Sequence, residues 1–232
     1  RRIEEFLDEN AEVIFYDRFY NWEVMAGSYL IKNSNWSRTF LQGFADYEFR
    51  LPKSFHGMDN GAIHAYLAEH ALPHNHEIVP ICMDIYNHSK GYDDLFLYEA
   101  CIRTALGNST LSGKIKILPK GTAWVRDNWM TNSKWNEERD FMIHNWKTTQ
   151  LRTYSTLPIP LISNSTGEWY NPIAGLLDLA LCTPGNTTWQ YDVNLMATRQ
   201  EIDDRLQKFA EDVERTRQKP DFLLNLYFNA NS

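Results

Sequence analysis

The sequence predicts an α/β fold in which short buried strands alternate with helices that pack on a sheet. Residues 11–16 form a nearly unbroken apolar run, which is typical of a buried strand. Residues 139–144 form a second short strand, and its last residue is His144. Between these strands, apolar residues at helical spacing follow Asp59, which stands where an N-cap belongs. Because α/β sheets bind ligands beyond the ends of their strands, His144 is a candidate site residue.

The other elements are predicted from shorter patterns. They are expected, in chain order, as a strand at 26–31, a helix at 37–44, a strand at 78–83, a helix at 95–102 and a strand at 115–118. Residues 1–7 read as an amphipathic helix. Thr198 and Glu201 form a capping box, so a final amphipathic helix is expected to begin there and to end before Pro220.

The composition is that of a folded globular protein. Hydrophobic residues make up 43% of the 232 residues and charged residues 23%, whereas disordered chains combine few aromatics with a large net charge. Aromatic residues make up 14%, and their rings stack on sugars as well as fill cores. The net charge of −7 disfavours binding to a phosphate backbone, so no nucleic-acid partner is expected. No apolar run approaches the ~20 residues that span a bilayer.

Sequons and cysteines bear on the cellular compartment. Asn-x-Ser/Thr sequons stand at Asn35, Asn87, Asn108, Asn164 and Asn186. Their number favours the secretory pathway. Cys82, Cys101 and Cys182 match no zinc or redox motif. They permit one disulfide and one free thiol, but we expect three buried thiols.

Three motifs, in order, resemble those of one enzyme superfamily. Residues 25–37 read Met-Ala-Gly-Ser-Tyr-Leu-Ile-Lys-Asn-Ser-Asn-Trp-Ser, residues 59–63 read Asp-Asn-Gly-Ala-Ile, and residues 140–146 read Asp-Phe-Met-Ile-His-Asn-Trp. They are similar to Asn-Ala-Gly-Ser-Phe-Leu-Ile-Arg-Asn-Ser-x-Trp-Ser, Asp-Gln-x-Ala-Leu and Asp-Phe-Val-x-His-Phe of the fungal and plant galactosyl-, mannosyl- and xylosyltransferases. Over about residues 1–155 the chain most resembles a group of nematode glycosyltransferase-like proteins.

The resemblance implies a fold and an activity. The fold is the three-layer nucleotide-diphospho-sugar transferase (GT-A-like) fold with a mixed sheet. The activity is a metal-dependent, retaining transfer of a hexose from a nucleotide-sugar donor to a glycan or glycoprotein acceptor. The implied location is the Golgi lumen, reached as a type II membrane protein whose anchor precedes this chain, or secretion.

The resemblance also implies how the chain is divided. In this group an Asp-x-Asp pair that holds the metal stands just ahead of the point where this chain begins. We therefore expect residues 1–155 to be the C-terminal part of a catalytic domain. Residues 156–232, which are rich in Pro, Asn, Ser and Thr up to residue 192, are expected to be a C-terminal extension with a terminal helix.

The motifs assign roles to three residues first. Asp59 and Asn60 are the expected catalytic residues, with a carboxylate and an amide directed at the donor sugar. Asn60 stands where the family has Gln, so its reach is one methylene shorter, and small misplacements at a reacting centre are costly. His144 is the expected metal ligand, an imidazole in an otherwise oxygen-rich Mn²⁺ or Mg²⁺ site that offsets the charge of the leaving diphosphate.

Four more residues are expected at the donor. Gly27 would let the backbone approach it, and Ser28 would bond a sugar hydroxyl. Asp17 follows the first strand and would face the donor. Lys147, where the family commonly has Gly, would pair with the diphosphate as a point charge. Met25 stands where the family has Asn, which affects recognition of the sugar or the acceptor.

Other interpretations remain open. A non-catalytic relative that binds glycan or has a structural role would explain Met25, Asn60 and the missing carboxylate pair. A glycoside hydrolase would need two placed carboxylates, and none can be assigned. Asp59 could act only as a helix cap and His144 only as a structural histidine, while the histidines of the 70–76 segment are expected at the surface.

Overall fold

The structure is a computed structural model that describes residues 1–19, 21–73, 76–107, 113–144, 196–216 and 220–225. The chain forms two compact units. The main unit comprises Arg2–Arg126 with Lys208–Ser232, and the second unit comprises Arg1 with Asp127–Gln207. The described chain combines a mixed sheet with helices, as predicted for the α/β class, but β1 and β2 are followed by four α-helices in succession, so strands and helices do not alternate as expected. The expected boundary at residue 155 lies outside the described residues.

A three-stranded sheet in the order β2-β1-β3 forms the base of the main unit. The central strand β1 (Val13–Tyr16) is buried at every residue, as its apolar run predicts. It pairs antiparallel with β2 (Leu30–Ile31) and parallel with β3 (Ile115–Leu118). Side chains alternate across the sheet, so Val13 and Phe15 enter one core cluster while Ile14 and Tyr16 enter another.

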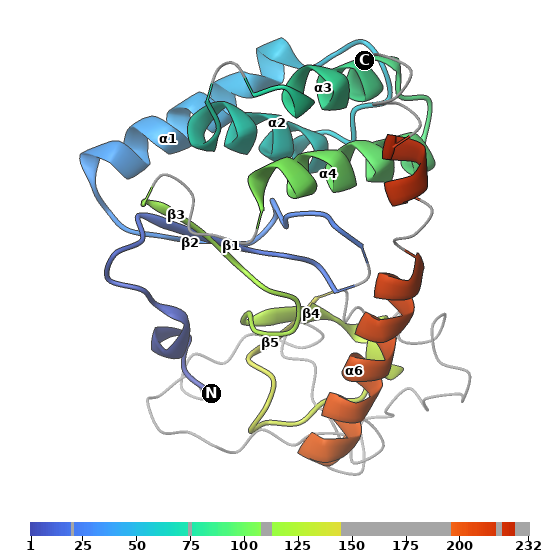
Figure 1. Cartoon of the computed structure of the whole chain (residues 1–232). Helices are drawn as coiled ribbons and strands as arrows, with labels where there is room; N and C mark the ends of the chain where they lie inside the picture. Colours follow the sequence, from blue (N-terminus) through green and yellow to red (C-terminus); the bar gives the residue numbers. More distant parts are fainter. Residues whose placement is uncertain (20, 74–75, 108–112, 145–195, 217–219, 226–232) are drawn as a thin grey trace, which may run out of the picture. The chain divides into compact units, whose positions relative to one another are not determined.

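Four helices lie together on one side of this sheet (Figure 1). They are α1 (Asn35–Asp46), α2 (Asp59–Ala71), α3 (Ile78–His88) and α4 (Tyr92–Leu106). Residues 61–68 of α2 are all buried, so α2 is the central helix of this layer. The Ser34 hydroxyl caps α1 by accepting a hydrogen bond from the Ser37 N–H at 3.1 Å.

Aromatic side chains cover the opposite face of the sheet. The Trp124 ring meets the Tyr16 ring edge-on, with centroids 5.1 Å apart, and the Phe6 ring at 6.0 Å. Phe6 belongs to a short 3-10 helix at Ile3–Phe6, where the sequence indicates an amphipathic helix. Such contacts between ring edges and faces are favoured by the ring quadrupoles and anchor the N-terminal segment to β1.

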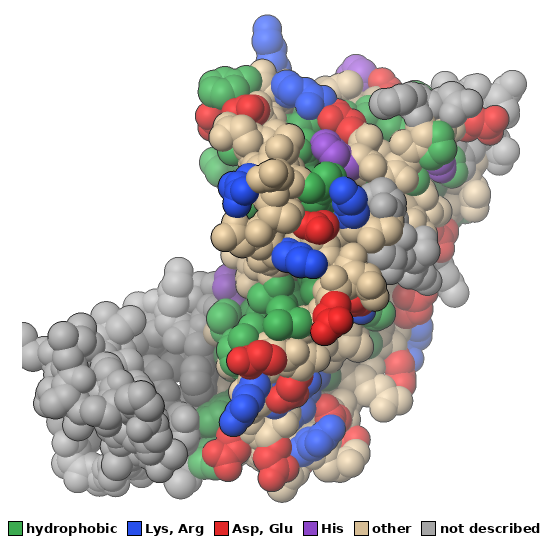
Figure 2. Space-filling view, turned by 90° about the vertical axis from the view of Figure 1, so that its left-hand side faces the viewer, with side chains coloured by type: hydrophobic (Ala, Val, Ile, Leu, Met, Phe, Trp, Pro, Cys, Tyr) green, Lys and Arg blue, Asp and Glu red, His purple; other side chains and the backbone are tan. Residues whose placement is uncertain are grey.

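The second unit begins within β4 (Val125–Asp127) and continues through a 3-10 helix at Asn128–Thr131. β5 (Met142–His144) confirms that a strand ends at His144, although the strand is shorter than the expected run. Figure 2 shows basic and acidic side chains interspersed over one face of the described surface.

Helix α6 (Arg199–Thr216) confirms the predicted capping box. The Thr198 hydroxyl accepts a hydrogen bond from the Glu201 N–H at 3.2 Å, and the Glu201 carboxylate accepts one from the Thr198 N–H at 2.8 Å. Ile202 and Leu206 of the predicted apolar stripe are buried. Within the described part of the chain, no helix is both long and apolar enough to cross a membrane.

Two predicted strands differ from the structure: the one at 78–83 is a helix, and the one at 26–31 is shorter than predicted. Residues 78–83 belong to helix α3, whose buried residues Cys82, Ile85 and Tyr86 follow helical spacing. Pro80 misled the prediction, yet it stands in the first turn, where no N–H is needed for an intrahelical bond. Of the run 26–31, only Leu30 and Ile31 pair with β1, because the chain leaves the sheet between its bridge at Val24 and β2.

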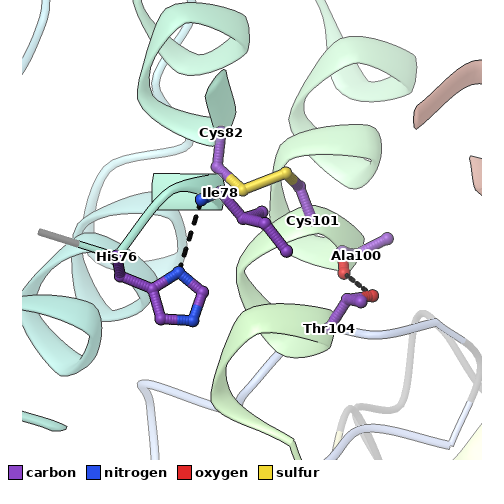
Figure 3. Close-up of a disulfide and its surroundings, with 6 residues drawn as sticks. All are labelled: His76, Ile78, Cys82, Ala100, Cys101 and Thr104. Carbon is purple, nitrogen blue, oxygen red and sulfur yellow. Dashed lines mark hydrogen bonds between the residues drawn. A yellow bond between two sulfur atoms is a disulfide. The ribbon is translucent and has the colours of Figure 1, made fainter. Parts of the chain in front are cut away.

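A disulfide between Cys82 and Cys101 joins α3 to α4 (Figure 3). The Cα atoms are 5.5 Å apart and both residues are fully buried. The expectation of three buried thiols is therefore wrong. The two cysteines lie 19 residues apart in sequence, and only the hairpin of two helices brings them together. Cys182 lies outside the described residues.

Candidate functional site

A hollow of about 880 Å³ opens at the start of α2 in the main unit. We call it the α2 hollow. It has a polar wall formed by Arg18, Glu23, His56, Asp59 and Asn60. The main residues of its other, aromatic wall are Phe55, Tyr92 and Phe96. Its size lies within the range of about 300–1,000 Å³ that small-molecule sites occupy.

The turn before α2 presents Asp59 and Asn60. The sequence predicts Asp59 as the N-cap of α2, but Asp59 is the first residue of the helix. Met58 takes the cap position, with φ 55° and ψ −127°. A positive φ at a residue with a Cβ costs roughly 1–3 kcal/mol, and such strain clusters at functional sites. Because Asp59 is not used as a cap, its carboxylate has no hydrogen bond or ion pair to the residues that the structure describes.

Two glycines permit this turn. Gly57 has φ 64°, and a Cβ there would lie 2.5 Å from the Leu95 Cδ2 atom of α4. A Cβ at Gly61 would lie 2.1 Å from the carbonyl oxygen of His56. Both contacts are shorter than real Cβ atoms make, so a side chain at Gly61 would displace the backbone at His56, while one at Gly57 would displace the Leu95 side chain and be strained by the positive φ.

Two stacked tyrosines hold both sides of the turn. The Tyr86 hydroxyl donates to the His56 carbonyl and the Tyr98 hydroxyl donates to the Gly61 carbonyl, each at 3.0 Å. Burial raises the pKa of both phenols, so their hydroxyls stay protonated and remain donors. The turn is thus fixed by side chains from α3 and α4, the two helices that the disulfide joins.

His64 ties the same turn to the chain beside β1. Its Nε2 accepts a hydrogen bond from the Val24 N–H at 3.0 Å, and its Nδ1 lies 2.7 Å from the Asn60 carbonyl oxygen. An accepting Nε2 requires the neutral tautomer with the proton on Nδ1, which donates to Asn60. Burial lowers the pKa of His64 to about 4, in keeping with a neutral ring.

A buried acidic pair lies behind the polar wall. Arg18 Nη1 donates to the Glu23 carboxylate at 3.2 Å, and Asn21 Nδ2 donates to it at 3.3 Å. Glu99 of α4 is fully buried, and its carboxyl oxygens have no hydrogen-bond partner among the described residues. Burial, with the nearby charge of Glu23, raises the pKa of Glu99 well above its usual range. Glu99 therefore keeps its proton to a higher pH than an exposed carboxyl group does, while Glu23 is paired.

The aromatic wall was not anticipated from the sequence. The Phe55 and Tyr92 rings meet edge-on at 4.9 Å, and the Tyr92 and Phe96 rings lie 5.9 Å apart. Tyr92 is 65% exposed and Met58, at the mouth of the α2 hollow, is 72% exposed. In the sequence, the aromatic wall could have been recognised from Tyr92 and Phe96, an i, i+4 pair of aromatic residues in the first turns of α4.

Three predicted donor residues lie in the main unit but do not line the α2 hollow. The Asp17 carboxylate forms a two-point ion pair with Arg103 at 2.8 and 2.9 Å. The Ser28 hydroxyl accepts a hydrogen bond from Trp124 Nε1 at 2.9 Å. Gly27 lies in the segment that leaves β1 before β2. Of the predicted residues, the structure thus brings together Asp59 and Asn60.

His144 lies in the second unit, at the end of β5. Its Nδ1 is 2.7 Å from an oxygen of the Asp127 carboxylate, and its side chain is 40% exposed. A carboxylate behind one imidazole nitrogen is the arrangement that orients histidine ligands of metals. The residues described by the structure contain no group of three or more His, Cys, Asp or Glu that could hold a metal ion. His144 therefore fits one ligand position and not a complete metal site, while Lys147 lies outside the described residues.

A comparison with protein families identifies a family for this chain. The model described as "Protein of unknown function, DUF273" matches residues 1–160. The chain belongs to the DUF273 family. No curated protein and no solved structure matches it.

The DUF273 region contains the α2 hollow of the main unit and, separately, His144 of the second unit. It also includes β1 to β5, whereas α6 follows it. The three motifs that resemble the galactosyl-, mannosyl- and xylosyltransferases also fall within it. The DUF273 description names no activity, so the function has to be argued from the site.

Proposed function

We propose that this protein is a glycosyltransferase that moves a hexose from a nucleoside-diphosphate sugar to a glycan, with the donor sugar in the α2 hollow. One observation supports this most. The two residues that the motifs mark as catalytic, Asp59 and Asn60, line a single hollow of about 880 Å³ and are presented by a strained turn. Strained backbone that is fixed by its surroundings is a feature of functional sites.

The polar wall suits a sugar. The Asp59 carboxylate, with no partner among the described residues, can accept hydrogen bonds from two sugar hydroxyls. The Asn60 amide both donates and accepts, and it would face the anomeric carbon. In the transfer, the bond between the anomeric carbon and the diphosphate oxygen breaks, and the electron pair leaves with the diphosphate. The acceptor oxygen forms the new bond to the anomeric carbon, and its proton passes to the departing diphosphate.

The proposed metal is Mn²⁺ or Mg²⁺. When bound, it would offset the negative charge of the leaving diphosphate. His144, oriented by Asp127, would be one of its ligands. The described residues contain no group of three or more His, Cys, Asp or Glu that would complete the site around it.

Activity tests this proposal directly. The complete gene product, with Mn²⁺, is incubated with the hexose donors UDP-galactose, UDP-glucose and GDP-mannose, and nucleotide release is measured. Asp59→Asn and Asn60→Ala are each expected to lower the rate by roughly 10²-fold or more, because both would touch the reacting sugar. Asp46→Asn, an exposed carboxylate elsewhere on α1, is the matched control. If no donor is turned over, the proposal that the protein is a glycosyltransferase is refuted.

A non-catalytic glycan-binding protein is the second candidate. It is favoured by the Asp17–Arg103 ion pair, which occupies a carboxylate expected at the donor. It is also favoured by the absence of a complete metal-ligand group among the residues that the structure describes. This candidate predicts sugar binding in the α2 hollow without nucleotide release, and without any effect of His144→Ala.

We propose the lumen of the secretory pathway as the location. The buried Cys82–Cys101 disulfide is typical of oxidising compartments. The sequon residues Asn35 and Asn87 are both exposed, at the first turn of α1 and the last turn of α3. When the protein is secreted from eukaryotic cells, enzymatic removal of N-linked glycans should therefore lower its mass. The single variants Asn35→Gln and Asn87→Gln should each show a smaller decrease in mass than the wild type.

A further inference from the structure

The aromatic wall of the α2 hollow exposes apolar surface that the fold does not require. Tyr92 is the first residue of α4 and is 65% exposed, so its ring contributes little to the core. Phe55 meets it edge-on at 4.9 Å from the loop before the turn, and this contact holds the ring in place. Met58, which is 72% exposed, extends the same apolar surface. Grouped exposure of large apolar side chains marks interaction sites.

The chemistry of the two walls restricts the occupant. The lining combines aromatic rings with a carboxylate without a described partner, an amide and an imidazole. A lipid chain would bury the Asp59 carboxylate against hydrocarbon, which is unfavourable. A pyranose ring has an apolar C–H face and a polar rim of hydroxyls, so it satisfies both walls at once.

The volume of the hollow allows for two sugars. It lies near the upper end of the range of ligand sites, larger than one monosaccharide needs. If the donor hexose lies against Asp59 and Asn60, the space beside Tyr92 is left for a second ring. Tyr92 lines the hollow and is 65% exposed, so a longer chain stacked on it could continue into solvent.

We infer that Tyr92, held by Phe55, is the platform on which a pyranose ring of the glycan acceptor stacks. This assignment to the acceptor rests on the proposed function; the stacking itself does not. The acceptor would bind with one C–H face on Tyr92 and its attacking hydroxyl directed toward the sugar at Asn60. Tyr92 would thus determine which acceptors are used and would leave the donor unaffected.

Binding without a donor tests the platform itself. Saturation-transfer NMR is measured on the complete gene product with mannotriose, xylotriose, cellotriose and lactose. At least one should bind, with the largest transfer to the axial C–H protons of one ring. Tyr92→Ala should weaken that binding about five- to tenfold, and Tyr92→Phe, which keeps the ring, should bind like the wild type. Phe49→Ala, which removes a ring that is 81% exposed outside the α2 hollow, is the control.

Steady-state kinetics then test the acceptor platform separately from the proposed transferase activity. Tyr92→Ala should raise the KM for the acceptor about five- to tenfold, whereas Phe49→Ala, outside the α2 hollow, should leave both the acceptor KM and donor hydrolysis unchanged. Equal binding by wild type and Tyr92→Ala, or no binding of any of the four sugars, would overturn the platform even if donor hydrolysis is observed. Sugar binding that depends on Tyr92, in a protein that hydrolyses no donor, would refute the transferase and retain the platform as a glycan-binding site.

Discussion

The rings of Tyr86 and Tyr98 stack 4.1 Å apart with only 6° between their planes, and their hydroxyls reach the two carbonyls that flank Asp59 and Asn60. Each ring thus fixes one side of the turn that presents the candidate catalytic residues. Their positions depend on the packing of α3 on α4, so the site rests on two helices that contribute no catalytic group.

Removing one of these hydroxyls should weaken both the fold and the site. Tyr98→Phe removes the side-chain donor to the Gly61 carbonyl, which keeps its bond within α2, and this should lower the free energy of unfolding by about 0.5–1.5 kcal/mol. Urea unfolding monitored by circular dichroism measures the change. Tyr92→Phe removes an exposed hydroxyl and should unfold like the wild type. An unchanged urea midpoint for Tyr98→Phe would contradict the role given to this bond.

The disulfide should make a large contribution to stability. Its cysteines are 19 residues apart, and a loop of this length restricts the unfolded chain by about 3 kcal/mol. The double change Cys82→Ala and Cys101→Ala should lower the free energy of unfolding by about that amount. Cys182→Ala is the control, with urea unfolding under non-reducing conditions as the measurement. If Cys82 and Cys101 both react with iodoacetamide in the unfolded, unreduced protein, the bond is absent.

His64 should make stability depend on pH. Its folded pKa of about 4 is below the unfolded value of about 6.5, so the unfolded state binds the proton more readily. The stabilisation is complete above about pH 6.5 and is lost as the pH falls toward 4, by up to about 3 kcal/mol. Unfolding of His64→Gln should lack this part of the pH dependence, whereas His88→Gln, an exposed change on α3, should keep it. Parallel pH profiles for wild type and His64→Gln would exclude the effect.

Glu99 should act in the opposite direction. Its folded pKa is raised, so it is protonated in the fold while the unfolded chain releases the proton above its ordinary pKa of 4.5. Stability associated with Glu99 is therefore present at low pH and is lost as the pH rises toward the folded pKa. Glu99→Gln should therefore be more favourable for the free energy of unfolding at pH 7.5 than at pH 4.5. Glu48→Gln, on the surface, should show no such difference between the two pH values.

The sequence predicted the elements whose signals are local. β1 is a continuous apolar run, and α6 begins with a capping box whose residues are neighbours in the chain. α3 was missed because its first residues are apolar and include Pro80, so its period becomes visible only at Cys82, Ile85 and Tyr86.

The candidate site was predicted only in part. Asp59 and Asn60 are adjacent in sequence, so a motif could identify them. The tyrosine pair, the His64 bonds and the aromatic wall all join segments that are distant in sequence. Tyr98 and the Gly61 carbonyl, for example, are 37 residues apart and meet only after α2 has packed on α4. No pattern along the chain reports such a contact.

The imidazole of His64 contacts the backbone at Val24 and at Asn60 simultaneously. Any displacement of the chain beside β1 would therefore pull on the first turn of α2, and the reverse is equally true. With two tyrosines fixing the turn from the other helices, Asn60 has little freedom to adjust. A ligand entering the α2 hollow would consequently meet a preorganised surface, and little of its binding free energy would be spent on reshaping the protein.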